Sequence, residues 1–287
     1  MTAVCSVYDG VFSPASCAVL HNAAQQRGLG HALYSRGGAG PSSPLEHAFE
    51  HFLSEIGDDS PHVEYWSRQE WRHIEAHADA DEALAAGGGA LRFPRHAHVL
   101  YLDVGTKVSG PTCIWEPSAG NRFGGALTTV PAVEGRVLRF DGELQHAVPR
   151  PAEVWLEPFV INQSGKPEEF MRSVVLFNCW PDIDAPPLDV HPEEAPAASS
   201  ALSEEDVALF TGTPRASWQS VDLHPKASSC EKLKTMKLWL LGDEARRGQP
   251  ERTLPMPVDA DVTMAALAEA SACTRIEPAT APSAEAR

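Results

Sequence analysis

Apolar and polar residues follow two different periods along this chain, and the period changes near residue 60. Before that point, apolar residues recur at helical spacing in two segments, which start at Ser13-Pro14 and Ser43-Pro44 and end at Gly28 and Gly57. A hydroxyl residue caps a helix start, Pro fits the first helical position, and Gly closes the last turn. The pattern therefore predicts two helices, and we expect them to support a sheet.

From residue 62 onward, short runs rich in β-branched and aromatic residues alternate with turn residues. The runs predicted as strands are 71–79, 98–104, 111–115, 126–130, 135–142, 146–148 and 172–180. Many short strands separated by turns indicate a sandwich or a barrel. The expected fold class is therefore mainly β with supporting helices.

The pattern divides the chain into four parts. We expect residues 1–60 to give helical support, 61–181 to form the β core, and 182–215 to be a loop rich in Pro, Ala and acidic residues. Such a composition buries too little apolar surface to offset the entropy lost on ordering. Residues 216–287 are expected to be an extension with an extra strand, a short helix and a disordered end from Thr274.

Composition argues against several classes of protein. The 287 residues and the 43% hydrophobic fraction suffice for one sizeable domain, and the apolar runs are too short to span a membrane. A formal net charge of -16 argues against a nucleic-acid partner, which needs clustered Lys and Arg. The N-terminus shows no secretory pattern, and the six Cys residues form no Cys-x-x-Cys pair. We therefore expect a cytoplasmic protein with reduced thiols and no membrane partner.

The strongest candidate for chemistry is the triplet His77-Ala78-Asp79. In an extended strand, side chains two positions apart point the same way, so this imidazole and carboxylate would face one point in space. With a third histidine, such a pair forms the 2-His-1-carboxylate face that holds non-haem iron(II) and leaves coordination positions open. Chance alone produces some His-x-acid triplets, and the chain has three others, which begin at His62, His73 and His191.

Three alternatives to this assignment stay open. The polar face of segment 71–79 is costly to bury unless it lines a wet or metal-bearing cavity, but the strand could instead lie at an exposed edge. His73-Ile74-Glu75 is a rival to the triplet in the neighbouring register. A cupin-type metalloprotein would use His96-Ala97-His98, although Leu102 stands where a cupin has its acidic ligand.

Several segments, taken in order, resemble the iron(II)/2-oxoglutarate dioxygenases of the prolyl 4-hydroxylase type. The segments that carry the resemblance are His77-Ala78-Asp79, Val99-Leu100-Tyr101-Leu102, Ser109-Gly110-Pro111-Thr112, residues 135–142 leading to His146, and Arg172 at the head of a strand. The similarity covers roughly residues 60–180. Two features depart from the family: Pro111 replaces a frequent second Gly, and the interval between His146 and Arg172 is long.

The resemblance implies a double-stranded β-helix, also called a jelly roll, with iron(II) held by His77, Asp79 and His146. It implies 2-oxoglutarate as co-substrate, O2 as oxidant, ascorbate as a further cofactor, and release of succinate and CO2. Relatives that halogenate lack the metal carboxylate, so Asp79 favours hydroxylation. The substrate would be a peptide, prolyl peptides included, or a small molecule. A catalytically inactive jelly-roll binding module is the alternative function.

The keto acid also needs a cation for its far carboxylate. By the same resemblance this cation is Arg172, with Tyr101 and Thr112 as hydroxyl donors from neighbouring strands. Arg150 also follows the distal histidine, but it stands between two prolines, which favour a surface turn. Arg172 could instead pair with a glutamate at the outer end of its strand.

Overall fold

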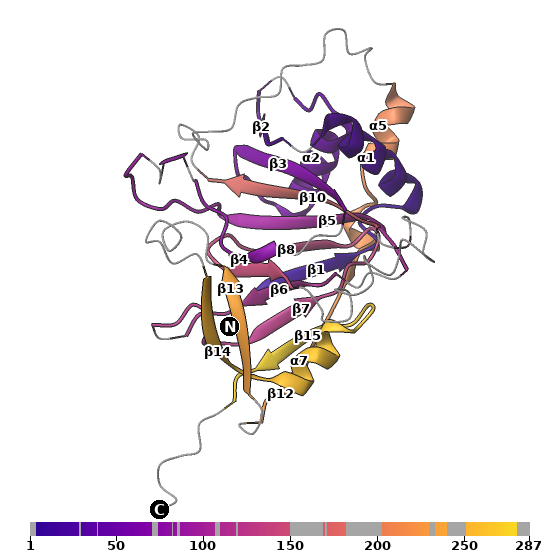
Figure 1. Cartoon of the computed structure of the whole chain (residues 1–287). Helices are drawn as coiled ribbons and strands as arrows, with labels where there is room; N and C mark the ends of the chain where they lie inside the picture. The colour runs from indigo at the N-terminus through magenta and orange to yellow at the C-terminus, as the bar shows by residue number, and fades with distance from the viewer. Residues whose placement is uncertain are drawn as a thin grey trace, which may run out of the picture.

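The computed structural model describes most of the chain. The residues it describes are 4–28, 30–38, 40–70, 74–81, 83–84, 87–106, 110–118, 120–149, 169, 171–181, 203–229, 233–239 and 251–279. Two facing β-sheets, with helices outside them, make up the centre of this part (Figure 1). No helix in these residues is long and apolar enough to cross a membrane.

Two helices form where the capping residues predict them. They are α1, which spans Pro14–Arg27, and α2, which spans Pro44–Ile56. Ser13 and Ser43 each accept a hydrogen bond from the backbone N–H three residues further on. Both helices bury apolar faces against one side of the larger sheet, as Figure 1 shows.

The strands form two large sheets and a separate hairpin. In spatial order the seven-stranded sheet contains β11 (Gln219–Ser220), β1 (Cys5–Asp9), β8 (Val137–Asp141), β5 (His96–Val104), β10 (Met171–Trp180), β3 (His62–Glu70) and β2 (Ala32–Ser35). The six-stranded sheet contains β12 (Leu223–Ala227), β15 (Cys273–Glu277), β7 (Leu127–Val130), β6 (Thr112–Trp115), β9 (Gln145–Val148) and β4 (Ile74–His77). The hairpin pairs β13 (Leu233–Trp239) with β14 (Glu251–Asp259).

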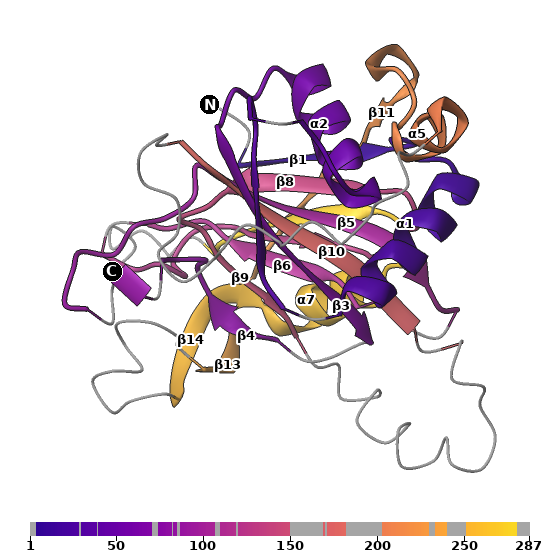
Figure 2. The same cartoon turned by 90° about the horizontal axis from the view of Figure 1, so that it is seen from above.

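The order of the central strands is that of a jelly roll. From β3 to β10 the chain passes back and forth between the sheets, which gives the antiparallel orders β8-β5-β10-β3 and β7-β6-β9-β4. In each sheet the last strand returns to pair with the first, as in a Greek key. Figure 2 shows the large sheet from the helical side, with β10 among its central strands. The expected mainly-β jelly roll with supporting helices is thereby confirmed.

The N-terminal part contributes more than helical support. Strands β1 and β2 extend the large sheet on its two sides, next to β8 and β3. Each is only four or five residues long, and the sequence pattern had not indicated either. The long strand expected over 71–79 is observed only as β4, and residues 71–73 lie outside the described part.

The C-terminal part is also more ordered than its composition suggested. Disorder was expected from Thr274, but Thr274 to Glu277 belong to β15, which pairs with β7 and β12. This expectation was wrong because β15 is buried on both faces: Cys273 packs in the core between the sheets, and Ile276 packs on the other side of the small sheet with residues of α7. Within the expected loop, α5 (Glu204–Phe210) packs on α1 and α2, whereas residues 182–202 lie outside the described part. Further on, η4 (Arg215–Ser217) precedes β11, and α7 (Ala260–Leu267) follows the hairpin.

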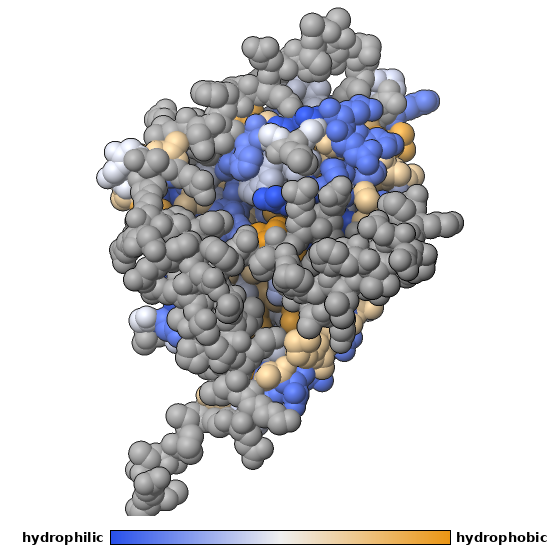
Figure 3. Space-filling model, viewed as in Figure 1, coloured by the Kyte–Doolittle hydropathy of each residue, from blue (hydrophilic) through white to orange (hydrophobic). Residues whose placement is uncertain are grey.

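Hydrophilic residues predominate over the helical side of the face seen in Figure 3, in keeping with the net charge of -16. Leu209 and Met264 are the large hydrophobic side chains exposed in the described part. The described Cys residues, Cys5, Cys17, Cys113, Cys179 and Cys273, are buried thiols.

We expect Gly135→Ala to destabilise the fold by about 2–4 kcal/mol. Gly135 has a φ of 76°, where a side chain costs about 1–2 kcal/mol, and a Cβ there would lie 2.8 Å from the Phe12 carbonyl oxygen. Gly37→Ala is the matched control, because Gly37 has a φ of 79° but open space around its Cβ position. Urea unfolding of both variants separates the two effects. Equal losses would show that the close approach to Phe12 carries no cost.

Candidate active site

Strand pairing brings two histidines of the predicted metal site face to face. His77, the last residue of β4, lies directly opposite His146 on β9, and the two ring centroids are 4.3 Å apart. Asp79 follows two positions after His77, so its carboxylate reaches the same point. Asp79 Oδ1 lies 3.4 Å from His77 Nε2 and 3.7 Å from His146 Nε2. Ligand atoms of all three residues lie within 4.8 Å of one another.

The protonation states of this cluster suit a cation. Burial, with a smaller contribution from the neighbouring His77, lowers the pKa of His146 to about 4. Burial opposes ionisation of Asp79, but the two imidazoles and a hydrogen bond from Asn178 outweigh it and hold the carboxyl pKa well below its usual range. His146 Nδ1 lies 3.2 Å from the Leu144 carbonyl oxygen, which can only accept, so Nε2 is left free to bind a metal.

A cavity extends from the two histidines into the barrel. The space between its walls and the solvent at its mouth together measure about 380 Å³. His77 and His146 line it together with Thr112 and Arg172. Its remaining walls are Trp66, Arg68, Ile74, Val99, Ala147, Val148 and Leu176. The cavity thus has a candidate metal site, cationic groups and largely apolar sides, which is the usual make-up of a small-molecule site.

Arg172 is a buried cation held by neutral groups. Its side chain is 2% exposed, Nε donates to the Gly110 carbonyl oxygen at 2.8 Å, and Nη2 donates to Thr112 Oγ1 at 3.2 Å. The Thr112 hydroxyl also bonds the Tyr101 hydroxyl at 2.8 Å, and the guanidinium lies 5.3 Å from the centre of the Tyr101 ring. Burial lowers the pKa of Arg172, and no described carboxylate forms an ion pair with it. A buried charge without a counter-ion is costly, so this corner of the cavity favours an anionic ligand.

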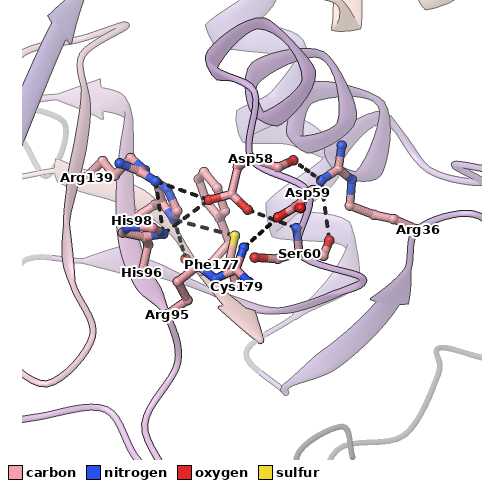
Figure 4. Close-up of polar contacts among 10 residues, drawn as sticks. All are labelled: Arg36, Asp58, Asp59, Ser60, Arg95, His96, His98, Arg139, Phe177 and Cys179. Carbon is pink, nitrogen blue, oxygen red and sulfur yellow. Dashed lines mark hydrogen bonds and ion pairs between the residues drawn. The ribbon is translucent and has the colours of Figure 1, made fainter. Parts of the chain in front are cut away.

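The histidines of the cupin alternative belong to a different cluster, shown in Figure 4. His96 Nδ1 lies 3.1 Å from Asp58 Oδ2 and 2.9 Å from Arg139 Nη2. His98 is 1% exposed, its Nδ1 donates to the Phe177 carbonyl oxygen, and burial lowers its pKa to about 3. Among the described residues, neither histidine is part of a group of three possible metal ligands. The cluster joins the end of α2 to the large sheet and gives the cupin assignment no support.

Asp58 makes this cluster sensitive to acid. Burial opposes ionisation of Asp58, but hydrogen bonds from His96, Ser60 and Arg139 keep its pKa far below the usual range. A carboxyl with a lowered folded-state pKa stabilises the fold above its unfolded pKa of about 4 and loses that effect as the pH falls below it. We expect Asp58→Asn to lower the free energy of unfolding by about 2–3 kcal/mol at pH 7, and by less at pH 3.

Asp59→Asn is the control for this prediction, because the Asp59 side chain is 87% exposed and pairs only at the surface with Arg95. It should change stability by less than about 0.5 kcal/mol at either pH. Urea unfolding at both pH values provides the measurement. If Asp58→Asn lowers the free energy of unfolding by the same amount at pH 3 and pH 7, the stabilisation does not come from an Asp58 carboxyl with a lowered pKa.

The structure brings together both groups of predicted site residues. His77, Asp79 and His146 form one cluster, and Tyr101, Thr112 and Arg172 form another at the same cavity. Their roles in binding iron and keto acid remain predictions. The rivals His73, Arg150 and His191 lie outside the described residues, and His62 bonds Ser35 on β2 instead.

Sequence reasoning missed other residues at this site. Trp66 and Leu176 line the cavity, Asn178 helps to lower the pKa of the Asp79 carboxyl, and the sequence pattern had indicated a role for none of the three. A signal was present, since Leu176 and Asn178 continue the alternation that starts at Arg172. Without the pairing partners of the strand, however, the alternation does not tell which side chains approach Asp79.

No family model matches this sequence, and no curated protein matches it either. The chain is similar to the solved structure of HygX from Streptomyces hygroscopicus with nickel and 2-oxoglutarate bound, at a TM-score of 0.38 and 15% identity over 63% of this chain and 84% of HygX. A prolyl-4-hydroxylase from Pseudomonas putida matches with a TM-score of 0.40 and 15% identity, over 62% of this chain and 86% of that enzyme. Viral collagen prolyl hydroxylase from Paramecium Bursaria Chlorella virus-1, in complex with 2-oxoglutarate, matches with a TM-score of 0.37 and 14% identity, over 62% of this chain and 97% of that chain.

Oxygenases of the kind that the sequence resembles are thus among the structural neighbours. Because the identities and TM-scores are low, the similarity to these structures carries no argument about the activity of this chain. The jelly roll follows from the strand order of this chain, and the chemistry must be inferred from its own cavity.

Proposed function

We propose that this chain is an iron(II)- and 2-oxoglutarate-dependent oxygenase that hydroxylates a peptide or small-molecule substrate. The observation that carries the proposal is a single cavity bordered by a 2-His-1-carboxylate cluster and by a buried arginine without an ion-pair partner in the described part. The first group suits a metal that must keep coordination positions open, and the second suits a carboxylate.

The donor set fits iron(II). The lowered pKa of His146 keeps its imidazole neutral near pH 7, as metal binding requires, His77 supplies the second imidazole, and Asp79 supplies the one negative charge. When bound there, iron would supply the redox chemistry that couples oxidation of the keto acid to oxidation of a substrate. The protein's own contribution is to fix three donors and leave the side toward the cavity open.

Arg172 would bind the far carboxylate of 2-oxoglutarate. Thr112 and Tyr101 hold the guanidinium from one side and can add hydroxyl donors to the same carboxylate. The apolar walls formed by Val99 and Leu176 would keep water away from the carbon chain between the two ends. Two-point binding of this kind orients the keto group toward the metal cluster.

Succinate release tests the proposal. The purified chain is incubated with iron(II), 2-oxoglutarate, ascorbate and air, with and without prolyl peptides or candidate small molecules, and succinate is measured. We expect iron-dependent succinate formation that rises when a suitable substrate is present. An inactive binding module would take up iron and keto acid under anaerobic conditions but release no succinate in air.

A further inference from the structure

Residues 77–81 form a crossing segment that leads from the small sheet toward the large one, and Asp79 lies at its middle. At one end, His77 is the last residue of β4, which pairs with β9 in the small sheet. At the other end, Asp81 contacts Arg92, which lies just before β5 of the large sheet. The pairing of β4 stops at His77, so the strand ladder does not fix Asp79. The place of its carboxylate therefore depends on how both ends of the segment are held.

Asp81 is held by three hydrogen bonds. Its side chain has no exposed surface, and Oδ2 accepts from Arg92 Nη2 at 2.6 Å. Oδ1 accepts from the Leu84 N–H at 3.0 Å, and the Asp81 N–H donates to the Arg92 carbonyl oxygen at 2.9 Å. A fully buried carboxylate is costly unless it is both paired and hydrogen-bonded. Contacts on both oxygens and on the backbone thus restrict Asp81 to one position.

Arg92 is in turn attached to the end of β10 in the large sheet. Its guanidinium lies 5.2 Å from the centre of the ring of Trp180, the last residue of that strand, and Trp180 is 1% exposed. A guanidinium over the face of an indole is attracted to it. Three residues further on, the Arg95 N–H donates to the Cys179 carbonyl oxygen at 2.8 Å. The pair of Asp81 and Arg92 therefore joins the far end of the crossing segment to the large sheet.

We infer that Asp81 is a positioning residue, whose ion pair with Arg92 sets the place of the Asp79 carboxylate relative to His77 and His146. Asp79 and Asp81 are separated by a span of at most about 7 Å of backbone, so a displacement of Asp81 is passed on to Asp79. The inference rests on the proposed function only in taking the three-residue cluster as a metal site. Groups that orient a metal ligand typically change metal affinity by about 10- to 100-fold when they are removed.

Nickel(II) binding, measured by calorimetry, provides the test because this ion needs no keto acid or O2 to bind. Asp81→Asn keeps the shape and an oxygen for the Leu84 N–H but removes the charge that pairs with Arg92, and we expect nickel affinity to fall by about 10-fold. Arg92→Gln removes the other charge of the pair, should have the same effect, and serves if Asp81→Asn does not fold. Arg92→Lys keeps a positive charge there and should recover most of the affinity.

Asp9→Asn is the matched control, because it breaks another pair of a carboxylate with a buried arginine. Arg136 is 2% exposed and its Nε donates to Asp9 Oδ1 at 2.7 Å, and neither residue lines the cavity. The control should be destabilised in urea and yet bind nickel like the unmodified chain. The cobalt(II) absorption spectrum reports the geometry of the ligands, and we expect it to change in Asp81→Asn and not in Asp9→Asn.

The outcomes separate this inference from the proposed function. If the unmodified chain binds no nickel at His77, Asp79 and His146, the proposed function fails and the inference fails with it. If it binds nickel there, while Asp81→Asn and Arg92→Gln bind within about twofold of it, only the positioning role is overturned. An equal loss in Asp9→Asn would also overturn that role, since it would reflect general loosening of the fold. So would an Arg92→Lys variant that binds nickel as weakly as Arg92→Gln, because the charge of the pair would then have no part in the effect.

Discussion

Replacing His77, Asp79 or His146 by alanine is expected to remove metal binding and, with it, turnover of the keto acid. Ligand atoms of the three residues lie within 4.8 Å of one another, so each substitution leaves only two protein ligands. Removing a residue that merely supports a ligand costs about 10- to 100-fold in affinity, so removing a ligand itself should cost more than about 100-fold. Calorimetry with nickel(II), followed by the succinate assay with iron(II), measures both effects.

His98→Ala is the control for the metal-ligand variants. It removes a buried histidine from the opposite face of the large sheet, next to α2, and should keep one metal ion per chain. Circular dichroism establishes that each variant is folded before binding is compared. The assignment is wrong if His98→Ala loses the metal while His77→Ala retains it.

The second large effect is expected at the other group of site residues, where Arg172→Ala should weaken 2-oxoglutarate binding by about 30-fold to a few thousandfold. Truncating one partner of a buried charge pair costs roughly 2–5 kcal/mol, and each 1.4 kcal/mol is about tenfold in affinity. Nickel affinity should stay unchanged, because the arginine side chain bonds Gly110 and Thr112 and no member of the metal cluster. Tyr101→Phe keeps the ring beside the guanidinium and removes only the hydroxyl, so a loss of about 3- to 10-fold is expected.

Anaerobic calorimetry of 2-oxoglutarate on the nickel-loaded chain decides this prediction. Arg275→Ala is a suitable control, because Arg275 pairs with Glu116 on the small sheet and does not line the cavity. If Arg172→Ala binds 2-oxoglutarate as tightly as the unmodified chain, Arg172 is not the residue that binds its far carboxylate. If Arg275→Ala weakens 2-oxoglutarate binding as much as Arg172→Ala does, the effect does not depend on the position of Arg172 in the cavity.

Much of the fold could be predicted because its signals are local. The caps at Ser13 and Ser43 fix two helix starts, and the alternating runs that include Tyr101 and Val174 mark the strands that form the barrel. Part of the candidate metal site could be predicted for a similar reason, since His77 and Asp79 stand only two positions apart in the sequence. His146 could be assigned to the same site only from the order of the segments that resemble the dioxygenase family, because no local pattern shows that β4 pairs with β9.

The remaining features depend on contacts between distant parts of the chain. Strands β1, β2 and β15 are short, and they are strands only because a neighbour offers an edge to pair with. The helix α5 is stabilised by Phe210, whose burial depends on the surfaces of α1 and α2.

Strand β10 limits how this protein can change during evolution. It carries Arg172 and Asn178 on one face, and six steps of roughly 3.3 Å separate them by about 20 Å. Hydrogen bonds to β3 on one side and β5 on the other keep the strand from sliding. Inserting or deleting one residue between them would turn one of the two side chains to the opposite face of the sheet. If the cavity binds a keto acid as proposed, a preference for a longer or shorter one is therefore expected to arise by exchange of side chains along the cavity, rather than by a change in the length of β10 beyond the irregular pairing near Ser173.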